Sequence, residues 1–382
     1  MTTPRVNRRE FVRGAASAAA ATAFGLTATY TVRAGNPERA ATGKILNYNP
    51  DMEYRRCGKT NLMVSAVCLG GHWKRIEEVL HKPKEGKGWM SAALGNPEFN
   101  KNRADVVSRC IERGMNYVDA CVQWEILAYA KALKGRRDKM YFGYSDEGMR
   151  DFGAERRKAQ SAGKTMPAGW ITRRLKEKLD RGMKAAGLEY VDLWRITCLE
   201  QSGQHSNDEI EEMVAALEWA KKTGRARFTG ISSHDRPHIK MLIAKFPGQL
   251  EVICTPYTAK TKVVTDESGL WAAMRKLDVG WFGIKPFASN SIFKGTSKPG
   301  NPHEEEDNRL ARLAIRYILC NPAIAAPIPG LITPQQVDNM ALAVMERREL
   351  DKEEKAELER AMDRAWANLP THYQWLKDWE YV

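Results

Sequence analysis

Several signatures of common protein classes are missing from this chain of 382 residues. No apolar run approaches the ~20 residues that a helix needs to cross a bilayer, so no membrane-spanning helix is expected. The seven cysteines contain no C-x-x-C pair, which argues against a zinc ribbon or an iron–sulfur run and favours buried free thiols. No G-x-G-x-x-G follows a predicted strand, which disfavours a Rossmann domain.

Basic residues outnumber acidic ones, and the formal net charge is +13. Residues 1–44 hold seven Arg and Lys against two Glu, so +5 of this excess lies in the N-terminal segment. The remaining basic residues share their segments with Glu, as in 173–184 and 353–364. This mixture is typical of solvated helix faces and predicts no nucleic-acid partner.

The N-terminal segment has the order of a secretion signal. Asn7-Arg-Arg-Glu-Phe-Val-Arg13, followed by an Ala/Thr-rich run to Tyr30, resembles a twin-arginine export signal. Val32-Arg-Ala34 offers a cleavage site of small-residue type. We expect an exported, periplasmic or extracytoplasmic protein with no stable membrane anchor after signal removal. The alternative is a low-complexity N-terminus with a chance arginine pair.

From Met63 onward, short apolar strands alternate with amphipathic helices, which predicts an α/β fold. Eight such units favour a closed (β/α)8 TIM barrel, whose active site lies at the carboxyl ends of the strands. We expect strands at 65–69, 116–120, 140–144, 191–196, 226–231, 251–254, 279–285 and 324–327.

The barrel is expected to cover 45–348, after the signal and linker of 1–44 and before a C-terminal part of 349–382. Two Gly/Pro/Lys-rich segments, 72–102 and 145–169, predict long loops after the first and third strands. The C-terminal part predicts a helix over 351–368 and an aromatic tail that either packs on the barrel or contacts a partner, with packing favoured. The tail contains Tyr373, Trp375, Trp379 and Tyr381.

Six segments in a fixed order resemble the aldo/keto reductase family. The most informative contains Gly114-Met-Asn-Tyr-Val-Asp119, which is similar to the strand that carries the family's active-site aspartate. The resemblance implies a barrel with an N-terminal hairpin, a nicotinamide cofactor and an Asp-Tyr-Lys-His tetrad. The similar segments are 53–65 with 67–71, 113–121, 132–139, 188–194, 224–233, and 327–330 with 333–336.

The first two tetrad positions match only in part. Asp119 occupies the aspartate position, although a strand-end aspartate can also serve only to accept backbone hydrogen bonds. The tyrosine position, five residues on, falls on Trp124, and Tyr129 is a candidate substitute. An indole N–H does not release a proton usefully, so the family's usual general acid is missing at this position.

The other two tetrad positions also differ. The lysine position falls on Ser145, beside Tyr144, which is a candidate proton donor, and the histidine position falls on Thr197. Lys285, at the end of the seventh strand, could supply the positive charge that Ser145 lacks, or it could pair with Asp266.

Two histidines follow strands and raise further candidates. His234 is a candidate proton donor, or only a residue at the start of a helix. His72, His234 and Asp146 have identities that suit a divalent metal, but nothing in their spacing supports one, so no metal is expected.

The resemblance also implies which residues would hold a nicotinamide cofactor. Cys254 falls near the family's glutamine, and Ile284 falls where the family stacks a tyrosine on the nicotinamide. The positions that grip a 2′-phosphate in NADP-using members are neutral here, which favours NAD over NADP. The candidate cofactor-binding residues are Ser232, Ser233, Gly330, Thr333 and Gln336.

Three functions stay open at this point. The first is a nicotinamide-dependent oxidoreductase that acts on a sugar-like or other small carbonyl or alcohol, with altered acid–base residues. The second is a catalytically inactive barrel, without a cofactor, that serves as a binding or assembly subunit. The third is a metal-dependent sugar isomerase, which needs a carboxylate and histidine constellation that the sequence does not supply. The oligomeric state is not indicated.

Overall fold

The computed structural model describes residues 45–81, 93–146, 148–197, 205–261 and 269–377. The predicted export signal, Asp266, Trp379 and Tyr381 lie outside these residues. Seven parallel strands form one sheet in sequence order, which confirms the predicted parallel pattern. They are β3 (Tyr117–Ala120), β4 (Tyr141–Asp146), β5 (Val191–Thr197), β6 (Ala226–Ser232), β7 (Val252–Pro256), β8 (Gly280–Ile284) and β9 (Ala326–Pro327).

The predicted first strand closes the sheet. The Leu69 N–H donates to the Tyr117 carbonyl, and Asp119 N–H donates back to the Leu69 carbonyl. On the other side, the Cys68 N–H donates to the Pro327 carbonyl. This segment therefore bridges β3 and β9 and completes a barrel of (β/α)8 type.

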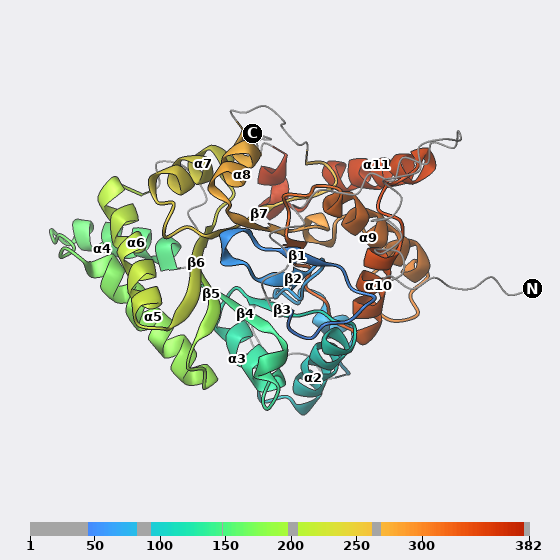
Figure 1. The fold of residues 1–382 in the computed structure, drawn as a ribbon, viewed down its shortest axis with the longest axis horizontal. Coiled ribbons are helices and arrows are strands. Elements are labelled where there is room, and N and C mark those ends of the chain that lie inside the picture. The colour runs from blue at the N-terminus through green and yellow to red at the C-terminus, as the bar shows by residue number, and fades with distance from the viewer. Residues whose placement is uncertain (1–44, 82–92, 147, 198–204, 262–268, 378–382) are drawn as a thin grey trace, which may run out of the picture.

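Helices surround the barrel, as Figure 1 shows. Each strand, beginning with the bridging segment, is followed by at least one helix, so eight strand–helix units are present. The segment expected as a long loop after the third strand contains α4 instead. The helices are α2 (Pro97–Glu112), α3 (Gln123–Ala132), α4 (Gly148–Ser161), α5 (Trp170–Ala186), α6 (Asn207–Lys222), α7 (Arg236–Lys245), α8 (Leu270–Leu277), α9 (Glu304–Leu319) and α10 (Pro334–Met345).

A hairpin lies across the amino end of the barrel (Figure 1). Its strands are β1 (Tyr54–Arg56) and β2 (Met63–Ser65), joined through the short helix η2 (Gly58–Thr60). Gly58 has a φ of +51°, and a Cβ there would overlap the backbone N of Gly280 at the start of β8. Only glycine fits this left-handed, close approach. The hairpin that the family resemblance implies is therefore present.

Side chains that alternate along the strands fill the barrel interior. Apolar side chains of the strands pack against Cys57, Leu62 and Val64 of the hairpin, so the amino end of the barrel is filled by a hydrophobic core. The apolar interior cluster comprises Cys57, Leu62, Val64, Cys68, Tyr117, Tyr141, Leu193, Val252, Cys254, Phe282, Ala325, Ala326 and Ile328.

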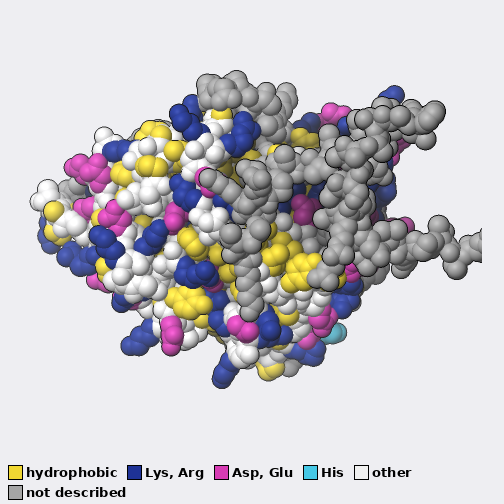
Figure 2. Space-filling model, in the orientation of Figure 1, with side chains coloured by type: hydrophobic (Ala, Val, Ile, Leu, Met, Phe, Trp, Pro, Cys, Tyr) yellow, Lys and Arg dark blue, Asp and Glu magenta, His cyan; other side chains and the backbone are white. Residues whose placement is uncertain are grey.

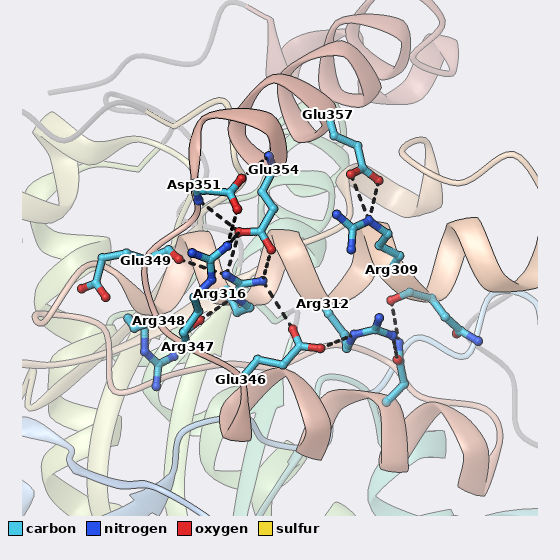
Figure 3. Close-up of polar contacts among 12 residues, drawn as sticks. Arg309, Arg312, Arg316, Glu346, Arg347, Arg348, Glu349, Asp351, Glu354 and Glu357 are labelled. Atoms are coloured by element: carbon cyan, nitrogen blue, oxygen red, sulfur yellow. Dashed lines mark hydrogen bonds and ion pairs between the residues drawn. The ribbon is translucent and has the colours of Figure 1, made fainter.

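The predicted C-terminal helix is α11 (Lys352–Ala367), which begins at a capping box on Asp351. Figure 3 shows how it is fixed to α9: the guanidinium of Arg316 donates to both carboxylate oxygens of Glu354, at 2.9 Å each. Arg309, about two turns before Arg316 on α9, binds Glu357, about one turn after Glu354 on α11, at 2.9 Å. A short helix, η6 (Thr371–Leu376), follows α11.

Lys and Arg are interspersed with Asp and Glu on the face shown in Figure 2. Within the described parts of the chain, no helix is long and apolar enough to cross a membrane. The six cysteines that lie there are free thiols, and four of them are buried.

Candidate functional site

Asp119, the last residue but one of β3, points into the barrel and forms a buried ion pair. One of its oxygens accepts from the guanidinium of Arg195, and the Tyr117 hydroxyl donates to the same oxygen at 2.9 Å. Arg195 comes from β5 and also donates to the Cys254 sulfur at 2.6 Å. Its side chain is 2% exposed, so its charge depends on Asp119 for compensation.

A glycine on the intervening strand makes room for this pair. Gly143 is the β4 residue in register with Asp119. A Cβ at Gly143 would overlap the Tyr117 hydroxyl and would lie 2.8 Å from an Asp119 oxygen. The absence of a side chain there lets two polar groups meet in the middle of the barrel.

The remaining tetrad positions carry no ionisable side chain in the barrel. The hydroxyls of Ser145 and Thr197 are hydrogen-bonded to one another, at the carboxyl ends of β4 and β5. Trp124 lies on the first turn of α3 with 52% of its surface exposed. The cation beside the aspartate is therefore Arg195, which reaches it from β5 across β4.

The two tyrosines proposed as substitute acids do not lie in the barrel interior. The Tyr129 hydroxyl donates to the Gly70 carbonyl and accepts from the Trp73 indole, at 3.0 Å for the latter, so it is a buried packing residue on α3. Burial raises its pKa. Tyr144 points outward from β4, where its hydroxyl faces Gly182 of α5. Alternation along β4 puts Ser145, not Tyr144, on the inner side.

His72 follows the first strand and binds a buried carboxylate. Its Nδ1 lies 2.8 Å from Glu125, and the same carboxylate accepts from the His72 and Cys121 backbone N–H groups, at 2.5 and 2.6 Å. Burial lowers the pKa of His72, but the Glu125 carboxylate and the Cys121 thiol outweigh it and raise the pKa to about 10. His72 is thus a cation held by Glu125.

A second polar group gathers where the C-terminal segment reaches the carboxyl ends of the strands. The Lys285 ammonium lies 5.6 Å from the Tyr373 ring centre and 5.7 Å from that of Trp375. Lys74 donates to the Tyr373 hydroxyl at 3.1 Å. His234 stacks on Trp375 with 4.1 Å between ring centres. The tail therefore packs on the barrel and brings Tyr373 between two lysines.

Beside this group lies a cleft of about 860 Å³, including the part open to solvent. It is bounded by the segment after β8, by α9, and by the loop that leads from β9 into α10. Gly330, Thr333 and Gln336 line it, whereas Ser232 and Ser233 do not. A Cβ at Gly330 would overlap the Gly71 carbonyl oxygen, so this loop requires glycine.

The chemistry of the cleft suits a phosphate-bearing ligand. Lys74, Arg75 and Lys298 line it, and the N-terminus of α10 opens onto it, capped by the Thr333 hydroxyl. Two carboxylates also line it: Asp307 accepts from the backbone N–H groups of Lys294 and Gly295, both at 2.8 Å, and Glu304 accepts from the Gly300 N–H at 2.5 Å.

No three His, Cys, Asp or Glu side chains converge on a possible metal position within the described ranges. His72 binds Glu125 and His234 stacks on Trp375, so these two histidines belong to separate groups.

Three residues of these groups were not identified from the sequence: Arg195, Lys74 and Tyr373. A strand residue two positions before the histidine position could have signalled Arg195, because that spacing places both on the inner side. The aromatic residues of the tail predicted packing on the barrel, but nothing in the sequence distinguished Tyr373 from the other aromatic residues of the tail.

Known proteins of one family are similar to this chain. The sequence matches the profile of the Aldo/keto reductase family over residues 86–311, more than half of the chain. It is 23% identical over 210 residues to an L-galactose dehydrogenase of Arabidopsis thaliana, covering 50% of this chain and 64% of that protein. It is 24% identical over 290 residues to an L-glyceraldehyde 3-phosphate reductase of Escherichia coli O157:H7, covering 72% and 70%.

Among solved structures, the fold is similar to an aldo-keto reductase from Bacillus halodurans in its holo form. The TM-score is 0.55 at 19% identity, covering 81% of this chain and 96% of that one. At this level of identity the likeness concerns the fold alone.

Proposed function

Because the chain belongs to the aldo/keto reductase family, we propose that it is an oxidoreductase that moves a hydride between a nicotinamide dinucleotide and a carbonyl or alcohol. The observation that carries the proposal is the cleft beside β8 and β9, whose cations and helix N-terminus suit a dinucleotide. Oxidoreductases among its relatives support the same class.

The cofactor would be held by the residues that line this cleft and would supply the hydride. Its phosphates would meet Lys74, Arg75, Lys298 and the N-terminus of α10. We propose NAD rather than NADP, because Gly330 has no side chain and the Gln336 side chain already accepts from the Ile332 N–H at 2.9 Å. Neither position offers a cation to a 2′-phosphate.

We propose a polyhydroxy, sugar-like substrate. The two relatives are named for L-galactose and for L-glyceraldehyde 3-phosphate. The Ser145 and Thr197 hydroxyls provide neutral donors and acceptors at the carboxyl ends of β4 and β5 that suit hydroxyl groups of such a substrate. We assign no proton transfer to Asp119, because its carboxylate neutralises the buried Arg195 guanidinium and fixes the position of that side chain.

A titration with NADH and NADPH tests the proposal, because eleven tryptophans supply an intrinsic fluorescence signal. We expect saturable quenching with tighter binding of NADH. Lys298→Ala should weaken binding by about two- to fivefold, the value of one exposed ion pair. Lys294→Ala is the matched control, since Lys294 lies on the same loop but binds Glu306 at 2.6 Å.

Two results would count against the proposal. Absence of binding by the parent protein would contradict a nicotinamide function. Equal affinities of the Lys298→Ala and Lys294→Ala variants would contradict the position assigned to the dinucleotide. Binding of the dinucleotide without turnover of any carbonyl or alcohol would instead support a binding subunit.

A further inference from the structure

The tyrosine that the tetrad lacks has a counterpart in the C-terminal segment. Tyr373 of η6 is 8% exposed and lies at the carboxyl-end face of the barrel. Its hydroxyl accepts a hydrogen bond from the Lys74 ammonium at 3.1 Å, and the Lys74 ammonium is 4.3 Å from its ring centre. Lys285 approaches the same ring at 5.6 Å. Two cations thus converge on one phenol.

The two lysines come from opposite ends of the barrel sequence. Lys74 follows the first strand, and Lys285 follows β8 with a left-handed φ of 57°. A non-glycine residue in this conformation is strained and persists only where surrounding contacts hold it. The chain therefore turns sharply at Lys285, directly after β8, and the Lys285 ammonium lies beside the Tyr373 and Trp375 rings.

This group adjoins the cleft described above. Lys74 lines the cleft and also donates to the hydroxyl of Ser289, whose neighbour Asn290 lines the cleft as well. The Tyr373 hydroxyl is therefore in direct contact with a cleft-lining side chain.

We propose that Tyr373, held between Lys74 and Lys285, is the proton donor for the substrate carbonyl oxygen, in place of the missing tetrad tyrosine. The inference rests on the proposed oxidoreductase function. In reduction, the carbonyl carbon accepts a hydride supplied by the reduced dinucleotide, and the carbonyl oxygen takes the phenolic proton. The C=O π bond is replaced by one C–H and one O–H bond, the dinucleotide is oxidised, and water returns a proton to the phenolate.

The electrostatics of the group agree with this role. Burial alone would raise the pKa of Tyr373, but the ammonium groups of Lys285 and Lys74 outweigh it and lower the pKa below the ordinary value for tyrosine. Burial in turn lowers the pKa of Lys74. A phenol with a lowered pKa gives up its proton more readily near neutral pH.

The C-terminal extension is built to keep Tyr373 in place. Arg316 and Glu354 fix the start of α11 to α9, and Arg309 with Glu357 fixes its second turn (Figure 3). The short helix η6 begins four residues after α11 ends and places Trp375 against His234, two residues beyond β6. The tail is thus held at both ends of its path to the mouth of the barrel.

Ultraviolet titration of the protein without any ligand gives a readout apart from activity. We expect one tyrosine of the parent to ionise at lower pH than the rest, and this phase to be missing in Tyr373→Phe. Lys74→Met and Lys285→Met should each move that phase to higher pH. Tyr317→Phe is the matched control, because it also removes a hydrogen-bonded hydroxyl, one that lies on α9 and donates to the Thr261 carbonyl at 3.0 Å. Superimposable titrations of the parent and Tyr373→Phe would overturn the proposal.

Steady-state reduction of glyceraldehyde by NADH gives the second readout. We expect Tyr373→Phe to lose at least about a hundredfold in kcat with little change in NADH affinity, since general acid catalysis is typically worth 10²–10⁴-fold. Tyr317→Phe should match the parent. Circular dichroism of each variant separates a lost proton donor from a lost fold.

The outcomes separate this inference from the proposed function. A parent that reduces glyceraldehyde while Tyr373→Phe does so equally well overturns the inference and leaves the function standing. An active Tyr373→Phe with an inactive Lys74→Met would assign the proton to Lys74 and also overturn it. A parent that binds no dinucleotide and reduces nothing contradicts the function itself, and the ultraviolet titration then still decides whether the lysines activate this phenol.

Discussion

Replacing Asp119 by alanine should destabilise the barrel severely, because it leaves the Arg195 guanidinium buried without a counter-charge. Arg195 is 2% exposed, and its other hydrogen bond goes to the neutral thiol of Cys254, whose pKa burial raises to about 12. Breaking a buried ion pair from one side costs about 3–5 kcal/mol. Loss of the acceptor for the Tyr117 hydroxyl adds about 1 kcal/mol. We expect a loss of about 4–6 kcal/mol in the free energy of unfolding.

The double variant makes this prediction specific. Arg195→Met alone should also cost about 3–5 kcal/mol, because it leaves the Asp119 carboxylate unpaired. Asp119→Ala with Arg195→Met buries no charge, so its cost should fall short of the sum of the single costs by at least about 2 kcal/mol. Urea unfolding, followed by circular dichroism, measures all three.

An exposed ion pair provides the control. Lys101 and Asp105 pair on α2 with side chains 76% and 46% exposed, and Lys101→Met should change the unfolding free energy by no more than about 0.5 kcal/mol. Additive effects of Asp119→Ala and Arg195→Met, or an Asp119→Ala cost comparable to the control, would refute the view that these two residues neutralise one another inside the barrel.

Three further predictions concern the surroundings of this pair and of the tail. Gly143→Ala should destabilise by about 1–3 kcal/mol, because its Cβ would overlap the Tyr117 hydroxyl, and a thermal melt no lower than that of the parent would contradict this. His72 has a pKa of about 10 when folded against 6.5 when unfolded, so its stabilising effect is complete below about pH 6.5 and lost as the pH rises through 10. His72→Gln should therefore flatten the pH dependence of the unfolding free energy between these two values. Urea midpoints of the parent that do not change between pH 6.5 and 10 would contradict this role of His72. Arg316→Met should cost about 1.5–3 kcal/mol, because Glu354 loses two charge-assisted hydrogen bonds but keeps Arg347 at 2.9 Å. Faster proteolysis of α11 should accompany it, and protection equal to that of the parent would speak against the prediction.

The fold could be predicted well because its signal is local. Short apolar strands such as 191–196 and 226–231 recur with amphipathic helices between them, and each lies within one or two residues of an observed strand. Composition misled in one place, since the polar segment after the third strand forms α4. Its helix-forming residues, such as Ala154, Glu155 and Arg156, outweigh the Gly and Pro at its margins.

The site was harder to predict because its contacts join residues far apart in the sequence. The position-by-position comparison placed Asp119 near a strand end and offered Lys285 in place of the lysine that is missing at Ser145, whereas the structure supplies Arg195 from β5. Lys285 reaches the carboxyl-end face as the sequence suggested, yet its neighbour there is Tyr373, 88 positions later in the chain (373 − 285). Periodicity cannot reveal such pairs, because it reports the side of an element and not which elements meet.

Deuterium transfer from reduced NAD to a carbonyl tests most directly the claim that the protein is a nicotinamide-dependent oxidoreductase. The protein is incubated with glyceraldehyde and reduced NAD that carries deuterium at both C4 positions of the nicotinamide ring, and the product is analysed by mass spectrometry. The account predicts glycerol with one deuterium on the carbon that was the carbonyl, formed at a rate that falls in Tyr373→Phe. Glycerol without deuterium, or no product from protein that binds the dinucleotide, would contradict it.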